Sequence, residues 1–137
     1  MRLILDTNIL ISALITVGGL ANRLWEAWRI RRFTLVTSDE QFEEFRRVTR
    51  YPRLRDYIQP ADAGTMLNEL RDRAMVLRDL PTVEVSSDPA DNFLLAMAGV
   101  SHADYLVTND QRGLLSLGHY GSTRIVTLRE IVAIVER

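Results

Sequence analysis

The chain alternates between short apolar runs and longer stretches in which apolar residues recur every three or four positions. The short runs have the length and composition of buried strands, and they cover Arg2 to Leu5, Phe33 to Thr37, Thr82 to Val85, Tyr105 to Thr108 and Arg124 to Thr127. The longer stretches have helical periodicity, and they cover Thr7 to Ile15, Leu20 to Ile30, Asp39 to Thr49, Ala61 to Asp79, Pro89 to Val100 and Leu128 to Glu136. The pattern predicts an α/β fold with five strands.

Strands that alternate with helices favour parallel pairing through right-handed crossovers, with helices on both faces of one sheet. No internal repeat, low-complexity stretch or linker interrupts the pattern, so we expect one domain over residues 1–137. A chain of this length can bury a self-sufficient core. In such folds the ligand site lies beyond the carboxyl ends of the strands, at the point where the strand order reverses.

Acidic side chains follow four consecutive predicted strands: Asp6, then Asp39 and Glu40, then Asp88 and Asp91, then Asp110. Carboxylates that converge on one crevice repel each other unless protons or a cation neutralise them. Mg²⁺ and Mn²⁺ prefer oxygen ligands and activate a coordinated water for attack on a phosphate. This is phosphodiester hydrolysis that needs no lysine, cysteine or histidine.

The composition narrows the possible chemistry. The chain has no cysteine, which excludes disulfides and thiolate catalysis. All 17 basic residues are arginines, so Schiff-base and P-loop lysines are excluded. Phosphoaspartate receivers and aspartate-nucleophile phosphatases also place an aspartate after a first strand, but they need a nearby lysine. The net charge of -1 does not by itself indicate a nucleic-acid partner.

We find no sequence signal for a membrane. Polar residues interrupt the apolar start of the chain between Leu3 and Val17, and no window reaches the roughly 18 uninterrupted apolar residues that a membrane span needs. The start also lacks the basic region and the cleavage site of a signal peptide. We therefore expect a cytoplasmic protein.

Four segments in order resemble the PIN domain family. The segment from Leu3 to Asn8 is an apolar strand that ends in an aspartate and a hydroxyl residue. From Ser38 to Val48, a serine begins a helix that carries Glu44 as the second acid. Asp88 to Asn92 begins an apolar helix, and Ala103 to Asp110 ends in a threonine and an aspartate. Together the four segments span the chain, which makes the resemblance more specific than any single motif.

The resemblance implies a PIN-like three-layer α/β/α sandwich with a five-stranded, mostly parallel central sheet. It also implies a Mg²⁺- or Mn²⁺-dependent endoribonuclease, most often the toxin of a bacterial toxin-antitoxin pair. Its partners would be an RNA substrate, an antitoxin protein and a second copy of the chain in a homodimer. The acids matched to the catalytic and metal-binding positions are Asp6, Glu44, Asp91 and Asp110, and the residues expected to orient them or their waters are Thr7, Asn8, Asn92 and Thr108.

One position departs from the family pattern. Many relatives carry a further aspartate two residues after the one matched to Asp110, and this chain has Arg112 there. Asp104 precedes its strand and does not obviously replace that aspartate. The number of bound metal ions therefore stays open. So does a second hypothesis, a degenerate PIN-like domain that binds RNA or a partner protein without cleaving.

Each acid taken alone also has a structural explanation. Asp6 can cap the helix that begins after it, and Asp88 can cap another while leaving Asp91 free. Glu44 can be a solvated helix carboxylate, and Asp110 can be a turn residue. Four such coincidences, each after its own strand, are a less economical explanation than one shared site.

Arginines crowd the segment that follows Glu44, at Arg46, Arg47, Arg50, Arg53 and Arg55. Guanidinium groups bind phosphates bidentately, so Arg46, Arg47 and Arg50 are candidate RNA-binding residues. A solvated helix face and a docking site for an acidic antitoxin segment are the alternatives. Trp25 and Trp28 share one helix face, a pattern typical of a core or a subunit contact.

Overall fold

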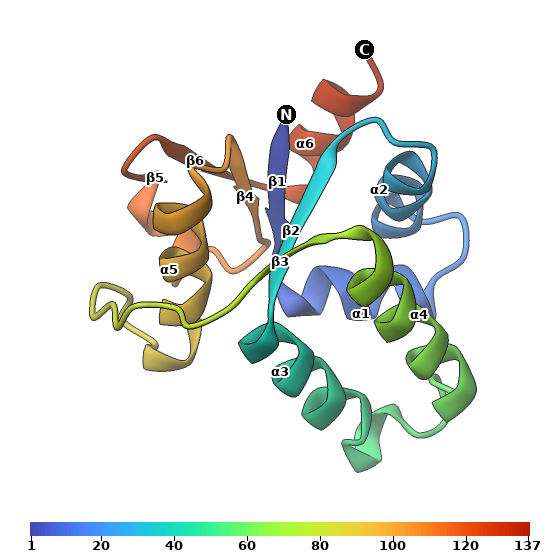
Figure 1. The fold of residues 1–137 in the computed structure, drawn as a ribbon. Coiled ribbons are helices and arrows are strands. Elements are labelled where there is room, and N and C mark those ends of the chain that lie inside the picture. Colours follow the sequence, from blue (N-terminus) through green and yellow to red (C-terminus); the bar gives the residue numbers. More distant parts are fainter.

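One mostly parallel sheet lies at the centre of the computed structural model, which describes residues 1–137 (Figure 1). Its six strands are β1 (Arg2–Leu5), β2 (Thr34–Ser38), β3 (Met75–Leu77), β4 (Tyr105–Val107), β5 (His119–Tyr120) and β6 (Thr123–Val126). The strand order is β3-β2-β1-β4-β6-β5, and every neighbouring pair is parallel except β5 with β6. The predicted α/β sandwich is confirmed, with six strands instead of five.

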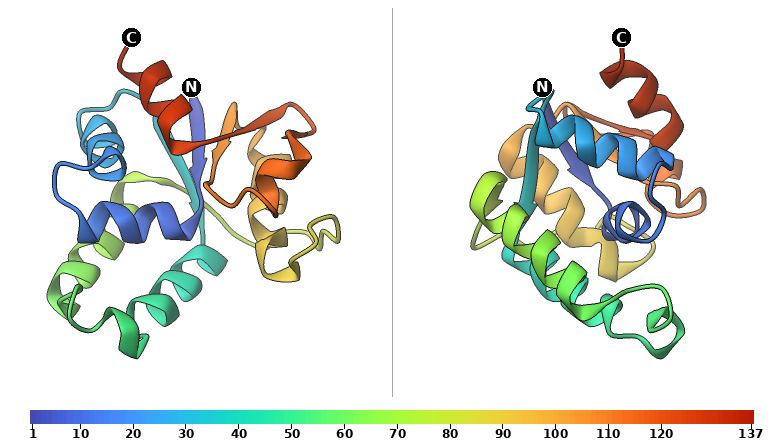
Figure 2. Two further views of the ribbon diagram at one scale, coloured as in Figure 1. Left: turned by 180° about the vertical axis from the view of Figure 1, so that it is seen from behind. Right: turned by 90° about the vertical axis from the view of Figure 1, so that its right-hand side faces the viewer.

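Five α-helices lie between strands along the chain, and a sixth follows the last strand: α1 (Thr7–Ile15), α2 (Leu20–Arg29), α3 (Asp39–Thr49), α4 (Pro60–Arg73), α5 (Asn92–Ser101) and α6 (Leu128–Val135). Three short 3-10 turns complete the elements: η1 (Pro52–Leu54), η2 (Pro89–Asp91) and η3 (Leu114–Leu117). Figure 1 shows the sheet nearly edge-on, with α5 on one side and α1, α2 and α4 on the other. The two views of Figure 2 show this layering from behind and from the side, with both termini at one end.

Alternation along the strands divides the core into two parts. In β1, Leu3 and Leu5 belong to one hydrophobic cluster, whereas Ile4 belongs to the other. The same switch occurs in β2, where Leu35 and Val36 face opposite ways. Because successive strand side chains point to opposite faces, a strand buried on both faces must be apolar at every position. This explains why the central strands are continuous apolar runs.

The third strand was predicted in the wrong place. The edge of the sheet beside β2 is occupied by Met75–Leu77, not by residues 82–85, and α4 ends at Arg73 instead of extending to Asp79. Asp79 has a left-handed backbone (φ 54°), which turns the chain away from the sheet after β3. The backbone N–H groups of Val85 and Ser86 donate to the side-chain oxygen of Asn92. These amides thereby find a partner without strand pairing.

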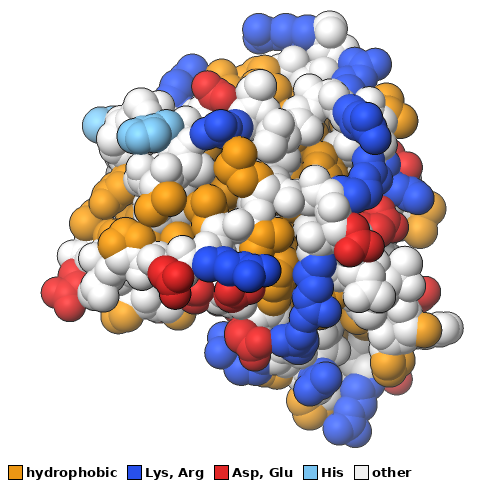
Figure 3. Space-filling model, in the orientation of Figure 1, with side chains coloured by type: hydrophobic (Ala, Val, Ile, Leu, Met, Phe, Trp, Pro, Cys, Tyr) orange, Lys and Arg blue, Asp and Glu red, His pale blue; other side chains and the backbone are white.

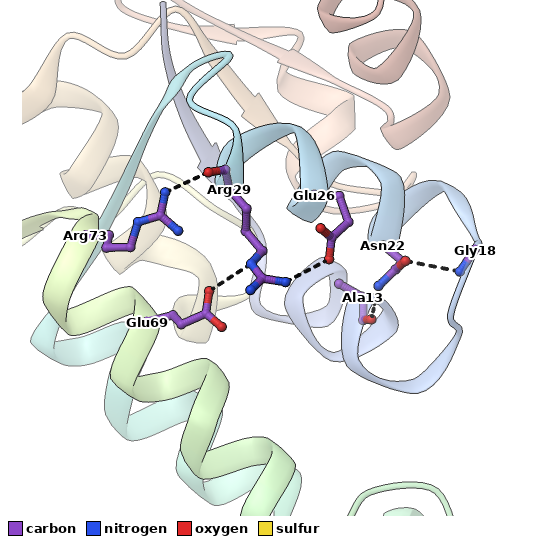
Figure 4. A network of polar contacts seen from close by, with 7 residues as sticks. All are labelled: Ala13, Gly18, Asn22, Glu26, Arg29, Glu69 and Arg73. Atoms are coloured by element: carbon purple, nitrogen blue, oxygen red, sulfur yellow. Dashed lines mark hydrogen bonds and ion pairs between the residues drawn. The ribbon is translucent and has the colours of Figure 1, made fainter.

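Polar contacts hold α2 against its neighbours (Figure 4). The Asn22 amide donates to the carbonyl of Ala13 at 3.3 Å and so links α2 to α1. Arg29 forms an ion pair with Glu69 of α4 at 3.3 Å, and Arg73 of α4 donates to the Arg29 carbonyl at 2.8 Å. These contacts leave the apolar face of α2 free to pack inward.

The aromatic face of α2 lies in the core of the chain itself. Trp25 and Trp28 are 5% and 4% exposed, and their ring centroids are 4.8 Å apart at an interplanar angle of 59°. Of the two roles predicted for this pair, a core contact or a subunit contact, the structure shows the core contact.

No single helix has both the length and the apolar character that a membrane crossing requires. Only α1 and α2 taken together pass that test, and they are bent by 97° at the break between them.

A buried amide connects α3 to the carboxyl ends of β1 and β2. Gln41 is 1% exposed, and its nitrogen donates to the Leu5 carbonyl at 2.7 Å. Its oxygen accepts from the Thr37 hydroxyl at 2.7 Å, and its nitrogen also lies 3.5 Å from the Thr7 hydroxyl. The α3 helix begins at the end of β2, where the Ser38 hydroxyl accepts from the Gln41 backbone N–H. Gln41 therefore fixes how α3 sits over the carboxyl end of β1.

We expect Gln41→Leu to lower the free energy of unfolding by about 2 to 4 kcal/mol, because it leaves a buried carbonyl and a buried hydroxyl without partners. Urea denaturation measures this change. Gln111→Ala is the matched control because Gln111 is exposed and its amide makes no hydrogen bond, so a change within about 0.5 kcal/mol is expected. Equal stability of both variants would contradict the role given to Gln41.

Candidate active site

The site lies where the strand order reverses. The chain runs outward from β1 to β2 and β3, and then returns to place β4 on the other side of β1. Asp6 directly follows β1, and Thr108 directly follows β4, so both stand at the carboxyl ends of adjacent parallel strands. The Asp6 backbone N–H donates to the Val107 carbonyl at 2.9 Å and continues the pairing past the strand ends. Ligand sites of open α/β sheets occur at this place.

Asp6 is both a helix cap and a buried acid. Its Oδ1 accepts from the backbone N–H of Asn8 at 3.4 Å, the capping role that its position allowed. Its Oδ2 accepts from the Thr108 hydroxyl at 2.8 Å. Burial raises the pKa of Asp6, and the Thr108 hydrogen bond offsets part of that shift. Only 8% of Asp6 is exposed, so its charge is costly to maintain without a cation.

The carboxylate of Asp110 is held by the turn that follows it. Its backbone N–H donates to the Thr108 hydroxyl at 3.2 Å, and its Oδ1 accepts from the Gly113 N–H at 3.1 Å. A Cβ atom at position 113 would lie 2.2 Å from Oδ2 of Asp110. Glycine at 113 is therefore required for this carboxylate position. Asp110 is the turn residue that its type suggested and also an acid at the crevice.

Glu44 projects from α3 toward the same crevice. Its side chain is 18% exposed, and Arg47 of the same helix lies 3.9 Å away. Burial raises the pKa of Glu44; the Thr7 hydroxyl and Arg47 lower it, whereas the negative charge of Asp6 raises it. The neighbouring Glu43 is 72% exposed and pairs with Arg46 instead. The turn of the helix thus directs Glu44 toward the other acids and Glu43 into solvent.

The negative charges of the other acids in the crevice raise the pKa of Asp91 in addition to burial. Its pKa rises to about 7, chiefly through burial and then through the negative charges of Asp6, Asp88, Asp110 and Glu44. The contributions of these charges place the other acids near Asp91. The structure thus brings the four predicted acids together from four separate segments of the chain.

Asp88 is the acid that sequence reasoning left outside the site. It caps η2 as expected, because its Oδ1 accepts from the Ala90 N–H at 3.0 Å. Its negative charge also raises the pKa values of Glu44 and Asp91. The sequence could have indicated this, because Asp88 lies only three residues before Asp91.

The four expected orienting residues divide into two pairs. Thr7 and Thr108 are buried beside carboxylates. Asn8 is exposed, and only its backbone N–H contacts Asp6. The side-chain oxygen of Asn92 accepts from the loop that precedes α5 and does not contact an acid. Asn92 therefore holds that loop, and its predicted role in orienting carboxylates or waters stays a prediction.

Arg112, at the position of the missing aspartate, is exposed in the turn before η3 and forms no ion pair. Asp104 lies at the opposite end of β4, where it accepts from the Arg2 backbone N–H at 2.7 Å. It therefore cannot take the place of the missing acid.

The donor set of the crevice consists of carboxylate and hydroxyl oxygens. No three acidic or histidine side chains in the chain are arranged closely enough to enclose a metal ion together. Mg²⁺ is typically bound through one or two carboxylates and keeps several waters, which suits an open group of this kind. Asp6, Glu44, Asp91 and Asp110 stay the predicted ligands of such an ion.

Comparison with known proteins identifies the family. A model of the PIN domain matches residues 2–112. The chain belongs to the PIN domain family. A solved structure of VapBC2 from Rickettsia felis, bound to a DNA fragment from their promoter, contains a similar chain with a TM-score of 0.60 and 14% sequence identity. The alignment covers 93% of this PIN domain and 98% of that chain. No curated protein sequence matches.

The raised pKa of Asp91 predicts how the stability of the metal-free PIN domain depends on pH. Its pKa rises from 3.8 to about 7 on folding, so the folded state binds this proton more tightly. The free energy of unfolding should therefore fall as the pH rises through this interval and stay low above it. We expect Asp91→Asn to stabilise the protein at pH 8 by about 1 to 2 kcal/mol, a value reduced for partial solvent exposure.

Urea denaturation in EDTA at pH 5 and pH 8 measures this effect. Asp72→Asn, which changes an exposed carboxylate of α4, is the control and should shift stability little at either pH. A destabilised Asp91→Asn at pH 8 would show that the carboxylates are not crowded.

The contact between Gly113 and Asp110 predicts a selective effect of a single methyl group. We expect Gly113→Ala to cost about 1 to 3 kcal/mol and to displace the Asp110 carboxylate in a crystal structure. Gly99→Ala is the control, because the nearest atom to a Cβ at position 99 is 3.7 Å away and a helix favours alanine. An unmoved carboxylate in Gly113→Ala would refute the positioning role.

Proposed function

We propose that this PIN domain is a Mg²⁺- or Mn²⁺-dependent endoribonuclease. The observation that carries the proposal is the meeting of Asp6 and Asp110 at the reversal point of the sheet, where both hydrogen-bond to the Thr108 hydroxyl. Glu44 and Asp91 lie near enough for the charge of Asp6 to raise their pKa values in addition to burial. A crowded group of carboxylates lowers the stability of the fold when no metal ion or proton neutralises it. A divalent cation relieves the repulsion and brings the catalytic power that the acids alone lack.

When bound, the ion supplies a coordinated water of lowered pKa and a positive charge beside the attacked phosphate. The chain contributes the positions of the oxygens. Thr108 holds Asp6 by a hydrogen bond, and Gly113 holds Asp110. Glu44 reaches the crevice from α3, whose place is set by Gln41. Because Asp6, Asp110 and Glu44 come from different elements, they would hold the cation from several sides.

The choice of RNA as substrate rests on the family resemblance of the four sequence segments. The same resemblance favours a toxin whose partner is an antitoxin, and the likeness to a VapBC2 chain supports that assignment. We extend the proposal to a homodimer acting on cytoplasmic RNA. An antitoxin would keep such a nuclease inactive until it is released.

A binding-only PIN domain is the second candidate. It is favoured by Arg112, which replaces an acid and adds a positive charge near Asp110. Such a domain would retain arginine contacts to phosphate without hydrolysing it.

We expect the wild-type protein to cleave a mixed pool of structured and single-stranded RNAs with Mg²⁺ or Mn²⁺ and to lose this activity in EDTA. Asp6→Asn should reduce the cleavage rate by about 100-fold or more, because it removes a charge directly at the metal. Gel analysis of labelled RNA measures both effects. Asp72→Asn should cleave like the wild type, because Asp72 lies on an exposed face of α4.

A second readout does not depend on catalysis. Mg²⁺ or Mn²⁺ should raise the melting temperature of the wild type at pH 8, and the increase should be smaller in Asp6→Asn. Metal-independent RNA binding without cleavage, together with no thermal shift, would instead support the binding-only candidate.

A further inference from the structure

A cleft of about 490 Å³ opens between the C-terminal end of α3 and the N-terminal half of α4. Its floor is apolar and is formed by Phe45, Ile58 and Leu67, which all belong to the hydrophobic core. The volume is within the usual range of about 300 to 1,000 Å³ for small-ligand sites. The cleft is therefore large enough for a ligand, and none of the carboxylates in the crevice lines it.

Three arginines surround the apolar floor: Arg46, Arg50 and Arg55. Arg46 is paired with Glu43, whereas Arg50 and Arg55 form no ion pair in the chain. Figure 3 shows basic side chains gathered over the lower part of the molecule, where α3 and α4 lie. No acidic residue lines the cleft. The lining thus combines an apolar surface with free positive charge and is complementary to a ligand with an apolar face and an anionic group.

A glycine of α4 borders the cleft. Gly64 lines it, and a Cβ built at this position meets no atom within 4 Å. Close packing does not require the glycine, and its backbone does not adopt a left-handed conformation. Alanine therefore fits at position 64, where glycine inside a helix costs about 0.5 to 1 kcal/mol relative to alanine. A large side chain at 64 is a way to fill the cleft from its border.

The place of the cleft favours a nucleotide over a helical peptide, because the cleft adjoins the helix that carries Glu44. A single base with its phosphate matches both parts of the lining. Single-stranded RNA is commonly recognised through bases that leave the stack and contact apolar or guanidinium surfaces.

The cleft and the acidic crevice are joined by α3. Arg50 follows Glu44 by six residues, which corresponds to about 9 Å along the helix axis. An extended strand advances by several ångströms per nucleotide, so a chain cut at the crevice reaches the cleft within a few nucleotides.

We propose that the cleft between α3 and α4 binds one nucleotide of single-stranded RNA, with its base on the apolar floor and its phosphates on Arg50 and Arg55. This site deepens the proposed ribonuclease function and rests on it for the identity of the strand. The cleft selects unpaired RNA, because a base inside a duplex cannot enter it.

The test measures binding of a labelled single-stranded RNA of mixed sequence, by fluorescence anisotropy in EDTA so that no cleavage occurs. Gly64→Phe fills the cleft and should weaken binding by about five- to tenfold. Gly64→Ala is the matched control and should bind like the wild type while unfolding at a slightly higher temperature. Melting curves of both variants show that they are folded, and Gly64→Leu serves if the larger side chain disturbs α4.

The two free arginines give an independent measurement. The double variant Arg50→Ala and Arg55→Ala should lower the slope of log K against log salt by about 1.4, or about 0.7 for each lost phosphate contact. Arg137→Ala, which changes an exposed arginine outside the cleft, should leave the slope unchanged. An RNA made of abasic nucleotides should bind wild type and Gly64→Phe equally.

Unchanged RNA affinity in Gly64→Phe would overturn the proposal. So would competition by polyglutamate that is lost in Gly64→Phe while RNA binding persists, because the cleft would then be a peptide site. Loss of RNA affinity in Gly64→Phe without metal-dependent cleavage by the wild type would retain the nucleotide site and refute the nuclease. Cleavage by the wild type with unaltered binding in Gly64→Phe would refute only the cleft.

Discussion

The hydrogen bond from the Thr108 hydroxyl to Asp6 joins the ends of the two central strands, and the rest of the site is arranged around it. These two residues are 102 positions apart and meet only because the chain returns across the sheet to place β4 beside β1. The hydroxyl also accepts the backbone N–H of Asp110. One threonine therefore sets the relative positions of two acids, and replacing it would disturb both.

The acidic crevice conflicts with stability, and the surrounding structure compensates for it. Buried carboxylates raise one another's pKa values, and in the absence of a cation this repulsion favours unfolding at neutral pH. Apolar clusters on both faces of the sheet provide the opposing stabilisation. Gly113 is a local example. The turn has a glycine, which is more flexible than other residues when unfolded, because only glycine leaves room for the Asp110 carboxylate. Functional sites commonly retain such costs.

The α3 helix serves both polar regions of the molecule. Its first turns carry Gln41, which binds the end of β1, and Glu44, which faces the acids. Its last turns carry Arg46 and Arg50 at the cleft with α4. The helix thus separates a negative crevice from a positive cleft within a few turns. In a chain with a net charge of -1, this separation gives the cleft a local positive charge.

The sequence alone determined the layered α/β architecture, because strands buried on both faces must be apolar throughout whereas their covering helices are periodic. The bounds of α1 and α3 followed from the caps Asp6 and Ser38. The edge strand β3 could not be predicted in this way. Met75–Leu77 continues a helical pattern, and only a free edge beside β2 selects it over residues 82–85. Local sequence preference does not determine which segment pairs with the free edge of a sheet.

The same limit applies to the site. The acids after β1 and β4 are determined by strand direction, since parallel strands bring their carboxyl ends together. The family resemblance of the sequence selected Glu44 among the glutamates of α3. That Asp88 lies near these acids and that Gly113 supports Asp110 depend on the path of the loops. Contacts between residues far apart in sequence set these features, so only the tertiary structure decided them.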